Sequence, residues 1–349
     1  MALKRPLDCL KNCMVSRFQR WLVVVMLVGV TGTGCRQESS SEFRFRYANE
    51  QPLGALRSQS MLFFEAELEK RSKERIQVEL YFGGVLGHER ELMDFVATGA
   101  LQGTRGGFFT DANPKYGLLM MPFLVNDWDQ AIRLVNSAFV RKINHEAAEN
   151  GFHIPATGIS QGFRAHTNNR RPLKHPDDLK GLKMRVPMQE VYVQTALAFG
   201  ENPQELPYTE VYQALQTGVV DGQDNAPANI WDFKIHEVSK YLTLTYYATG
   251  PDPFMVNLDW YQTLPAELKE VFDEVARETM TLSDQLNRDK EQEYIDQLSA
   301  KLETNIVSGV ALQPFREAVQ PAYEYFISRG DFTKDDVKRA RAAAAGVGS

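Results

Sequence analysis

Short segments with strand periodicity alternate with helical segments from residue 43 onward, and this alternation constrains the fold of the chain most. Residues 43–50 (FRFRYANE) alternate apolar and polar side chains, residues 56–73 have helical spacing, and residues 75–82 (RIQVELYF) alternate again. A helix from about Glu89 with a glycine stop at Gly99 follows. Because strands separated by helices pair in helix-covered sheets, the sequence predicts an α/β fold with mixed, mainly parallel sheets.

The middle of the chain leads into a second unit of the same kind. Residues 120–151 have helical spacing, and residues 152–160 read as a strand. The segment 172–187 opens the second unit: Pro176 and the two aspartates after it suit a short helix start, and Lys183 to Val186 make a strand.

Two more helices, each closed by a glycine, and two more strands complete the second unit. These are residues 190–200, closed by Gly200, residues 209–222, with Thr209 as N-cap and Gly218 as stop, and strands at 241–247 and 253–257.

A helical pattern of unusual length follows. Residues 264–303 keep helical periodicity, with Pro265 at the start, over more residues than one globular helix normally spans. A chain of 349 residues can form two cores. We therefore expect two lobes with this helix bracing both. The expected divisions are lobe I mainly at 43–160, lobe II mainly at 161–260, a C-terminal helical region at 261–335 and a flexible tail at 336–349.

The N-terminus has the composition of an export signal. Residues 1–20 are basic, residues 21–30 are apolar but too few to anchor in a bilayer, and small residues precede Cys35. Residues 1–34 are predicted to be a signal peptide, with Cys35 as the lipid-bearing residue of a lipoprotein and 35–42 as a polar tether. Plain cleavage stays open, because a larger aliphatic residue is usual where Gly32 stands.

Charge and cysteine usage exclude several functions. Removing residues 1–34 takes away five basic residues and one acid, so the formal net charge falls from −6 to −10 and nucleic acid is not expected as a partner. Only Cys35 would remain, which excludes a disulfide or a CxxC site. The six histidines lack metal-ligand spacing and no phosphate-binding loop occurs, so neither metal nor cofactor is expected.

One catalytic motif is present. Residues 158–162 (GISQG) match the G-x-S-x-G nucleophile elbow, which would make Ser160 the nucleophile of a secreted hydrolase, with His236 as a possible base. The turn formers at 163–172 provide no apolar helix after the serine. We keep this hydrolase as the alternative from another functional class.

Arg185 is the strongest candidate for binding. It stands at the end of the predicted strand 183–186, where open α/β sheets bind ligands, and its guanidinium matches a carboxylate bidentately. A salt bridge between lobes is the competing interpretation. Arg164 is a second cation of this kind.

Four phrases in one order then resemble a family. They are GFRAHTNNRRP (162–172), DLKGLKMRVP (178–187), LPYTEVYQALQTGVVDGQDN (206–225) and EVSKYLTLT (237–245). Together they resemble the substrate-binding proteins of tripartite ATP-independent periplasmic (TRAP) transporters, of the dicarboxylate and sugar-acid type. The resemblance covers nearly the whole chain after residue 35 and implies a two-lobed Venus-flytrap fold.

The resemblance also implies roles for particular residues. Arg185 would clamp the ligand carboxylate, Arg164 would add a second contact, Asn225 would hydrogen-bond the same carboxylate, and Tyr208 would form an aromatic wall. In lobe I, the cleft-lining phrases supply candidates for contacts to ligand hydroxyls: Asn49, Glu50, Glu89 and Arg105.

The function that the resemblance implies is capture of an organic acid in the periplasm and its delivery to membrane permease subunits, without catalysis. A sugar acid such as a hexuronate is preferred. A four-carbon dicarboxylate is the alternative, with Arg164 or Arg105 as the second cation. We expect a monomer whose membrane contact is through the permease and a lipid on Cys35.

Overall fold

Two large sheets organise the computed structural model, which describes residues 41–347. The first sheet has the order β2 (Ile76–Tyr81), β1 (Phe43–Ala48), β3 (Gly103–Thr104), β12 (Met255–Asn257) and β4 (Phe152–His153). β1 is parallel to β2 and β3, whereas β12 is antiparallel to both of its neighbours. We call the part built on this sheet lobe I.

The second sheet forms lobe II. Its order is β13 (Glu303–Ile306), β10 (Tyr241–Leu244), β6 (Ala165–Asn168), β9 (Gly222–Asn225), β7 (Lys183–Val186) and β8 (Asn202–Glu205). β7 is parallel to β8 and β9, and β10 is parallel to β13, but β6 is antiparallel to both of its neighbours. The α/β class is as expected, with antiparallel pairing more frequent than the sequence indicated because β6 and β12 are reversed.

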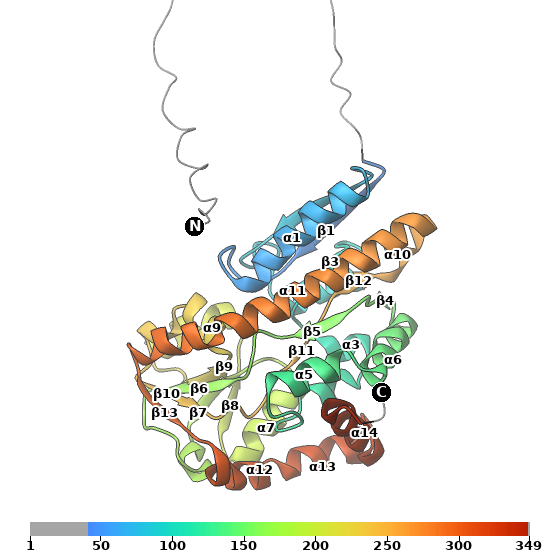
Figure 1. The fold of residues 1–349 in the computed structure, drawn as a ribbon. Helices are drawn as coiled ribbons and strands as arrows, with labels where there is room; N and C mark the ends of the chain where they lie inside the picture. The colour runs from blue at the N-terminus through green and yellow to red at the C-terminus, as the bar shows by residue number, and fades with distance from the viewer. Residues whose placement is uncertain (1–40, 348–349) are drawn as a thin grey trace, which may run out of the picture. The chain divides into compact units, whose positions relative to one another are not determined.

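Helices surround both sheets (Figure 1). They are α1 (Leu56–Arg71), α2 (Glu89–Ala97), α3 (Phe109–Ala112), α4 (Tyr116–Leu119), α5 (Trp128–Val135), α6 (Ala138–Glu146), α7 (Glu190–Phe199), α8 (Val211–Gln216), α9 (Pro227–Asp232), α10 (Leu258–Thr263), α11 (Ala266–Ser299), α12 (Gln313–Ala318), α13 (Gln320–Arg329) and α14 (Lys334–Ala345).

The long helix α11 packs against both lobes, as expected. Phe272 and Val275 lie in the core of lobe I, where Phe272 stacks edge-on against Phe45 at 5.1 Å between ring centroids. Ile295 and Leu298, further along the same helix, lie in the core of lobe II. Beside it, β5 (Thr157–Ile159) and β11 (Pro251–Pro253) form a two-stranded antiparallel sheet. The exact boundaries 43–160 and 161–260 stay a prediction.

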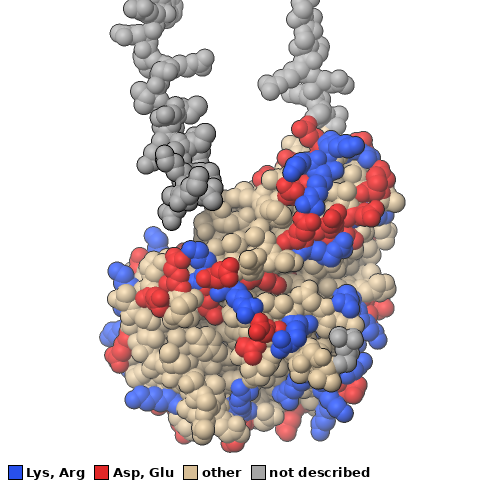
Figure 2. All heavy atoms as spheres, in the orientation of Figure 1, with Lys and Arg blue, Asp and Glu red and all other residues tan. Residues whose placement is uncertain are grey.

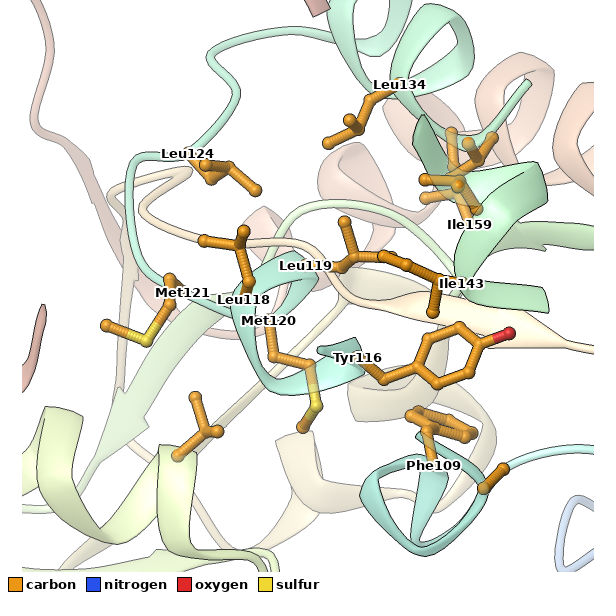
Figure 3. Packing of buried hydrophobic residues seen from close by; sticks show 14 of the residues in the cluster. Phe109, Tyr116, Leu118, Leu119, Met120, Met121, Leu124, Leu134, Ile143 and Ile159 are labelled. Carbon is orange, nitrogen blue, oxygen red and sulfur yellow. The ribbon is translucent and has the colours of Figure 1, made fainter. Parts of the chain in front are cut away.

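Another buried cluster surrounds α4 (Figure 3). Phe109, Tyr116 and Ile143 pack here, and the hydroxyl of Tyr116 donates to Oδ1 of Asn144 at 2.6 Å. The cluster continues to α13 and α14 and to Val191 of α7, so it joins segments from distant parts of the sequence.

Charged side chains of both signs are intermingled on the face shown in Figure 2. Where α1 and the turn after it meet α11, Nη2 of Arg71 lies 2.6 Å from Oε2 of Glu278, and Nη1 of Arg75 lies 3.0 Å from Oε1 of Glu267. Exposed pairs of this kind contribute little to stability, about 0–1 kcal/mol each.

Three expected elements differ in the structure. The helical segment 120–151 is divided, because Asp127 and Ser137 accept hydrogen bonds from the N–H groups three residues later and start new helices, α5 and α6. Pro155 separates β4 from β5 within the single strand expected at 152–160. Thr209 is not an N-cap: it lies inside a 3-10 turn, Tyr208–Glu210, that leads into α8.

The expected flexible tail at 336–349 is also corrected. Residues 334–345 form α14, whose Val337, Ala340 and Ala344 are buried against α5 and α6. Nε of Arg133 on α5 donates to the carbonyl of Ala344 at 2.7 Å and so satisfies the end of the helix. The alanine run is therefore a packed helix.

The signal at 1–34, Cys35 and most of the tether lie outside the described residues. Within 41–347, no helix is long and apolar enough to span a bilayer. The same part of the chain contains no group of three or more His, Cys, Asp or Glu side chains that could hold a metal ion.

Candidate ligand-binding cleft

A polar cleft lies where the carboxyl ends of strands from both lobes meet. Its lining residues come largely from the segments that follow β1, β3, β5, β7 and β9, with α1, α2 and α7 contributing side chains. They are Glu50, Gln51, Arg57, Glu89, Gly106, Gly107, Phe109, Ser160, Gln161, Arg164, Arg185, Pro187, Gln189, Tyr192, Tyr208, Asn225 and Asn229. This is the edge at which open α/β sheets bind ligands.

Arg185 is buried in this cleft with much of its charge uncompensated. Its Nε donates to the carbonyl of Leu206 at 2.8 Å, and its guanidinium lies 4.9 Å from the ring centroid of Tyr208. No carboxylate of residues 41–347 lies within 4.0 Å of it. Burial disfavours the charged form and lowers the pKa of Arg185 to about 10, so the group remains a cation at neutral pH. The competing interpretation of an interlobe salt bridge does not hold in this structure.

Arg164 lines the same cleft but has an acid partner. Its Nε donates to the carboxylate of Asp224 and its Nη2 donates to the Asp224 carbonyl at 2.7 Å, while the guanidinium lies 4.6 Å from the ring of Tyr192. Burial alone would raise the pKa of Asp224, yet Arg164 outweighs burial and holds it below its usual value. The charge of Arg164 is therefore largely neutralised before any ligand arrives.

Asn225 and Tyr208 stand beside these arginines. Oδ1 of Asn225 accepts from the N–H of Ala226 at 2.9 Å and from Nδ2 of Asn229 at 2.8 Å. Because its oxygen is occupied, Asn225 presents its Nδ2 group to the cleft as a donor suited to a carboxylate. The ring of Tyr208 lies under Arg185 and lines the cleft, at the position where the resemblance implied an aromatic wall, and its contact with a ligand stays a prediction.

Lobe I contributes two acids to the cleft, the buried Glu50 and the partly buried Glu89. Burial, with the nearby charge of Glu89 as a second cause, raises the pKa of Glu50 to about 7, although His88 opposes the shift through a 3.0 Å contact between Nδ1 and Oε1. Burial also raises the pKa of Glu89, against the opposing charge of Arg57. These carboxyl groups can accept hydrogen bonds when ionised and donate when protonated.

Two of the expected ligand contacts lie elsewhere. Asn49 is turned into the protein, where its Oδ1 accepts from the N–H of Gln51. Arg105 is fully buried outside the cleft and donates to Ser60 and Ser283, at 2.6 and 2.9 Å, and to the carboxylate of Asp252. Both side chains are committed to holding the backbone and the core, so their assignment to ligand binding is corrected.

Arg57, which the sequence analysis did not single out, lines the cleft. Its Nε lies 3.3 Å from Oδ2 of Asp252 and its Nη2 donates to Oγ of Ser160 at 3.3 Å. A signal was present, because Arg57 shares the helical spacing of buried Met61 and Phe64, and a cation on the apolar face of a helix needs a special partner.

Several amides were also missed. Gln51 Oε1, Gln161 Nε2, Gln189 Oε1 and Asn229 Oδ1 are buried and have no hydrogen-bond partner among the described residues, and all four residues line the cleft. Uncharged amide side chains occur in loops and helices alike, so nothing in the sequence context of these four residues distinguished them. Unpaired buried amide groups favour a ligand rich in hydrogen-bonding groups.

The surroundings of Ser160 differ from those of a nucleophile elbow. β5 ends at Ile159 and the chain bends through Gln161, at φ 56°, to reach β6, so no helix follows the serine. His236 stacks on Trp231 at 4.4 Å and is not among the residues that line the cleft. Ser160 is instead a hydroxyl in the cleft wall that accepts from Arg57.

Two α/β lobes, a long helix common to both and a polar cleft between them define a periplasmic solute-binding protein. The family described as bacterial extracellular solute-binding protein, family 7, matches residues 48–329, and the chain belongs to this family. This is a family of transport proteins that bind solutes in the periplasm, and the expected TRAP assignment is confirmed by the solved relatives.

Three relatives illustrate the similarity. The chain is 29% identical over 278 residues to the sialic acid-binding periplasmic protein SiaP of Vibrio cholerae, covering 79% of this chain and 86% of that protein. A TRAP periplasmic solute-binding protein of Haemophilus influenzae with bound L-gulonate superposes with a TM-score of 0.82 at 25% identity, covering 86% of this chain and 99% of the other. One from Roseobacter denitrificans with bound β-D-glucuronate gives 0.81 at 25%, with the same coverage.

Proposed function

We propose that this protein binds a sugar acid, such as a hexuronate or a hexonate, through one carboxylate and several hydroxyl groups. The observation that carries the proposal is the contrast between the two walls of the cleft. Arg185 lacks an acid partner within the described residues, whereas lobe I offers two carboxyl groups, Glu50 and Glu89, and the amide oxygen of Gln51. The ligand carboxylate would pair with Arg185 and Asn225, and its hydroxyls would reach lobe I.

A four-carbon dicarboxylate fits this cleft less well. Its second carboxylate would need another cation, but Arg164 pairs with Asp224 and Arg57 and Arg105 share Asp252. Glu50 and Glu89 would repel a second anion whenever either is ionised. The relatives with bound L-gulonate and β-D-glucuronate agree with the sugar-acid proposal.

Binding would proceed by lobe closure. Contacts from lobe I and lobe II meet only when the cleft is closed, so a ligand that contacts both lobes stabilises that state. In this proposal the closed, loaded protein then delivers the acid to a TRAP permease in the membrane. A lipid on Cys35 would keep the protein at the membrane surface. The intact mass of the exported protein would reveal whether this lipid is present.

A thermal-shift screen tests the proposed ligand class. D-glucuronate, D-galactonate and L-gulonate should raise the melting temperature, because a ligand that binds only the folded state stabilises it by mass action. Succinate and unsubstituted hexanoate serve as matched comparisons for a second carboxylate and for missing hydroxyls. A larger shift with succinate than with every sugar acid would contradict the proposal.

A further inference from the structure

Gln189 connects the two lobes directly across the cleft. It lies between β7 and α7 in lobe II, its side chain is buried, and its Nε2 donates to the carbonyl of Gly107 in lobe I at 3.1 Å. A carbonyl can only accept a hydrogen bond, so this contact fixes which way the amide faces. The hydrogen bond can form only while the lobes are closed.

The acceptor is held in place by a glycine that cannot be replaced easily. Gly107 has φ +116°, which side chains rarely adopt, and a Cβ there would lie 3.2 Å from the backbone oxygen of Glu89. The chain therefore presents the Gly107 carbonyl beside the start of α2, next to the acids that face the cleft.

The other end of the same amide has no partner. Oε1 of Gln189 is buried and accepts no hydrogen bond from residues 41–347, although Gln189 lines the cleft together with Arg185 and Glu89. An unpaired buried acceptor disfavours the closed state, since water would satisfy it when the cleft opens. A ligand hydroxyl donating to Oε1 would remove that penalty.

We propose that Gln189 is a specificity-determining residue that makes lobe closure depend on a ligand hydroxyl. This inference rests on the proposed function and adds the means by which hydroxylated acids are selected. A carboxylate without the matching hydroxyl can still pair with Arg185, but it leaves Oε1 unpaired and the closed state less populated. A second contact between the lobes, 3.1 Å between Thr209 Oγ1 and His88 Nδ1, has no unpaired end facing the ligand and would not discriminate in this way.

The test combines two variants of Gln189 with a series of L-gulonates that each lack one hydroxyl. Gln189→Met keeps the length of the side chain but removes donor and acceptor. Gln189→Glu, measured at pH 8, keeps acceptors and removes the permanent donor. Gln194→Met is the matched control, because Gln194 lies on α7, the helix that begins directly after Gln189, and bonds to Glu190 outside the cleft.

Dissociation rates from stopped-flow fluorescence and closure from small-angle X-ray scattering are the measurements. We expect Gln189→Met to release L-gulonate roughly 10- to 100-fold faster and to abolish the penalty for one deoxygenated ligand, as for the loss of one or two buried hydrogen bonds. Gln189→Glu should release it faster but keep that penalty. Gln194→Met should match the parent protein.

Two results would overturn the inference and separate it from the proposed function. If Gln189→Met folds, releases L-gulonate at the parental rate and still discriminates among the deoxygenated ligands, Gln189 has no such role, even though sugar-acid binding stands. If the parent protein binds none of the sugar acids in the screen, the proposed function fails and this inference fails with it.

Discussion

Arg185 lies with its guanidinium 4.9 Å from the ring centroid of Tyr208, so a buried cation rests on an aromatic face instead of against an acid. Arg164, directly before β6 on the other side of β9, has Asp224 as its partner. The cleft is thus prepared with one charge that a ligand must neutralise, and this difference between two arginines leads to the first two predictions.

Replacing Arg185 with alanine should abolish sugar-acid binding. Leaving a buried carboxylate without its partner costs about 3–5 kcal/mol, or a loss of affinity of roughly 100- to 5,000-fold. Arg185→Lys should recover only part of the affinity, since lysine cannot bind a carboxylate through two parallel hydrogen bonds. Isothermal titration calorimetry measures both, with Arg170→Ala as control, because Arg170 is an exposed arginine that does not line the cleft. Parental affinity in Arg185→Ala would contradict the clamp.

Replacing Arg185 with methionine should stabilise the ligand-free protein. Burial lowers the pKa of Arg185 to about 10, which means that folding disfavours its charge. Arg185→Met removes that charge and keeps most of the volume, so the free energy of unfolding should rise by about 1 kcal/mol or more. Urea unfolding without ligand provides the measurement, and a clear decrease would show that Arg185 supports the fold.

Replacing Arg105, in contrast, should lower the stability of the ligand-free protein. Burial would raise the pKa of Asp252, but Arg105 and Arg57 outweigh it and keep this fully buried carboxylate ionised. Arg105→Met leaves Asp252 with one partner, and we expect a loss of about 3–5 kcal/mol in the free energy of unfolding. If the Arg105→Met protein is as stable as the parent but binds ligand more weakly, Arg105 contributes to ligand binding instead.

Stability of the ligand-free protein should fall as pH rises from about 4.5 to 7. Burial, then Glu89, raises the folded-state pKa of Glu50 from 4.5 to about 7, so in this interval the folded protein holds a proton that the unfolded chain has lost. The stabilisation is complete below pH 4.5 and is lost as pH passes through 7.

Glu50→Gln should make this decline shallower by on the order of 1–3 kcal/mol, because a glutamine holds no titrating proton. Thermal unfolding across the pH series gives the slope, and exposed Glu149→Gln is the control. An unchanged slope in Glu50→Gln would assign the decline to other buried acids, such as Asp284, whose pKa burial also raises to about 7.

Deleting residues 334–349 should destabilise the protein, because α14 contributes Val337, Ala340 and Ala344 to a core that also contains α5. We expect a loss of roughly 2–4 kcal/mol, as for the removal of two or three buried apolar side chains. Calorimetry compares the truncated protein with Lys338→Ala, an exposed change on the same helix. A deletion that leaves the stability unchanged would instead support the flexible tail that the composition of this segment suggested.

Local sequence patterns correctly predicted those helices and strands that are ended by residues next to them in the sequence. The strand at Lys183–Val186 and the helix ended by Gly200 have the expected limits, since Pro187 and a glycine in the left-handed region stop them locally. The prediction of a flexible tail at 336–349 was wrong for the opposite reason. An alanine-rich segment has little hydrophobic periodicity, and only its packing against α5 and α6 makes it a stable helix.

The same distinction between local and distant information applies to the residues of the cleft. Arg185 could be found because it ends a readable strand, whereas Arg105 looked equivalent until the structure placed Asp252 beside it from 147 residues away. Gln189 could not be found at all, because its partner Gly107 lies in the other lobe and a glutamine after a proline turn has no distinctive pattern. Contacts between segments that are distant in the sequence determine which polar residues face the cleft. These contacts cannot be inferred from a single sequence.

The position of β12 between β3 and β4 has a consequence for how the chain is made. Residues 255–257 leave the ribosome only after most of the second sheet has been synthesised, yet β4 has no place in the first sheet without them. The N-terminal portion therefore cannot mature as an independent unit during synthesis, and a fragment that stops near residue 160 would carry an open strand edge prone to aggregation.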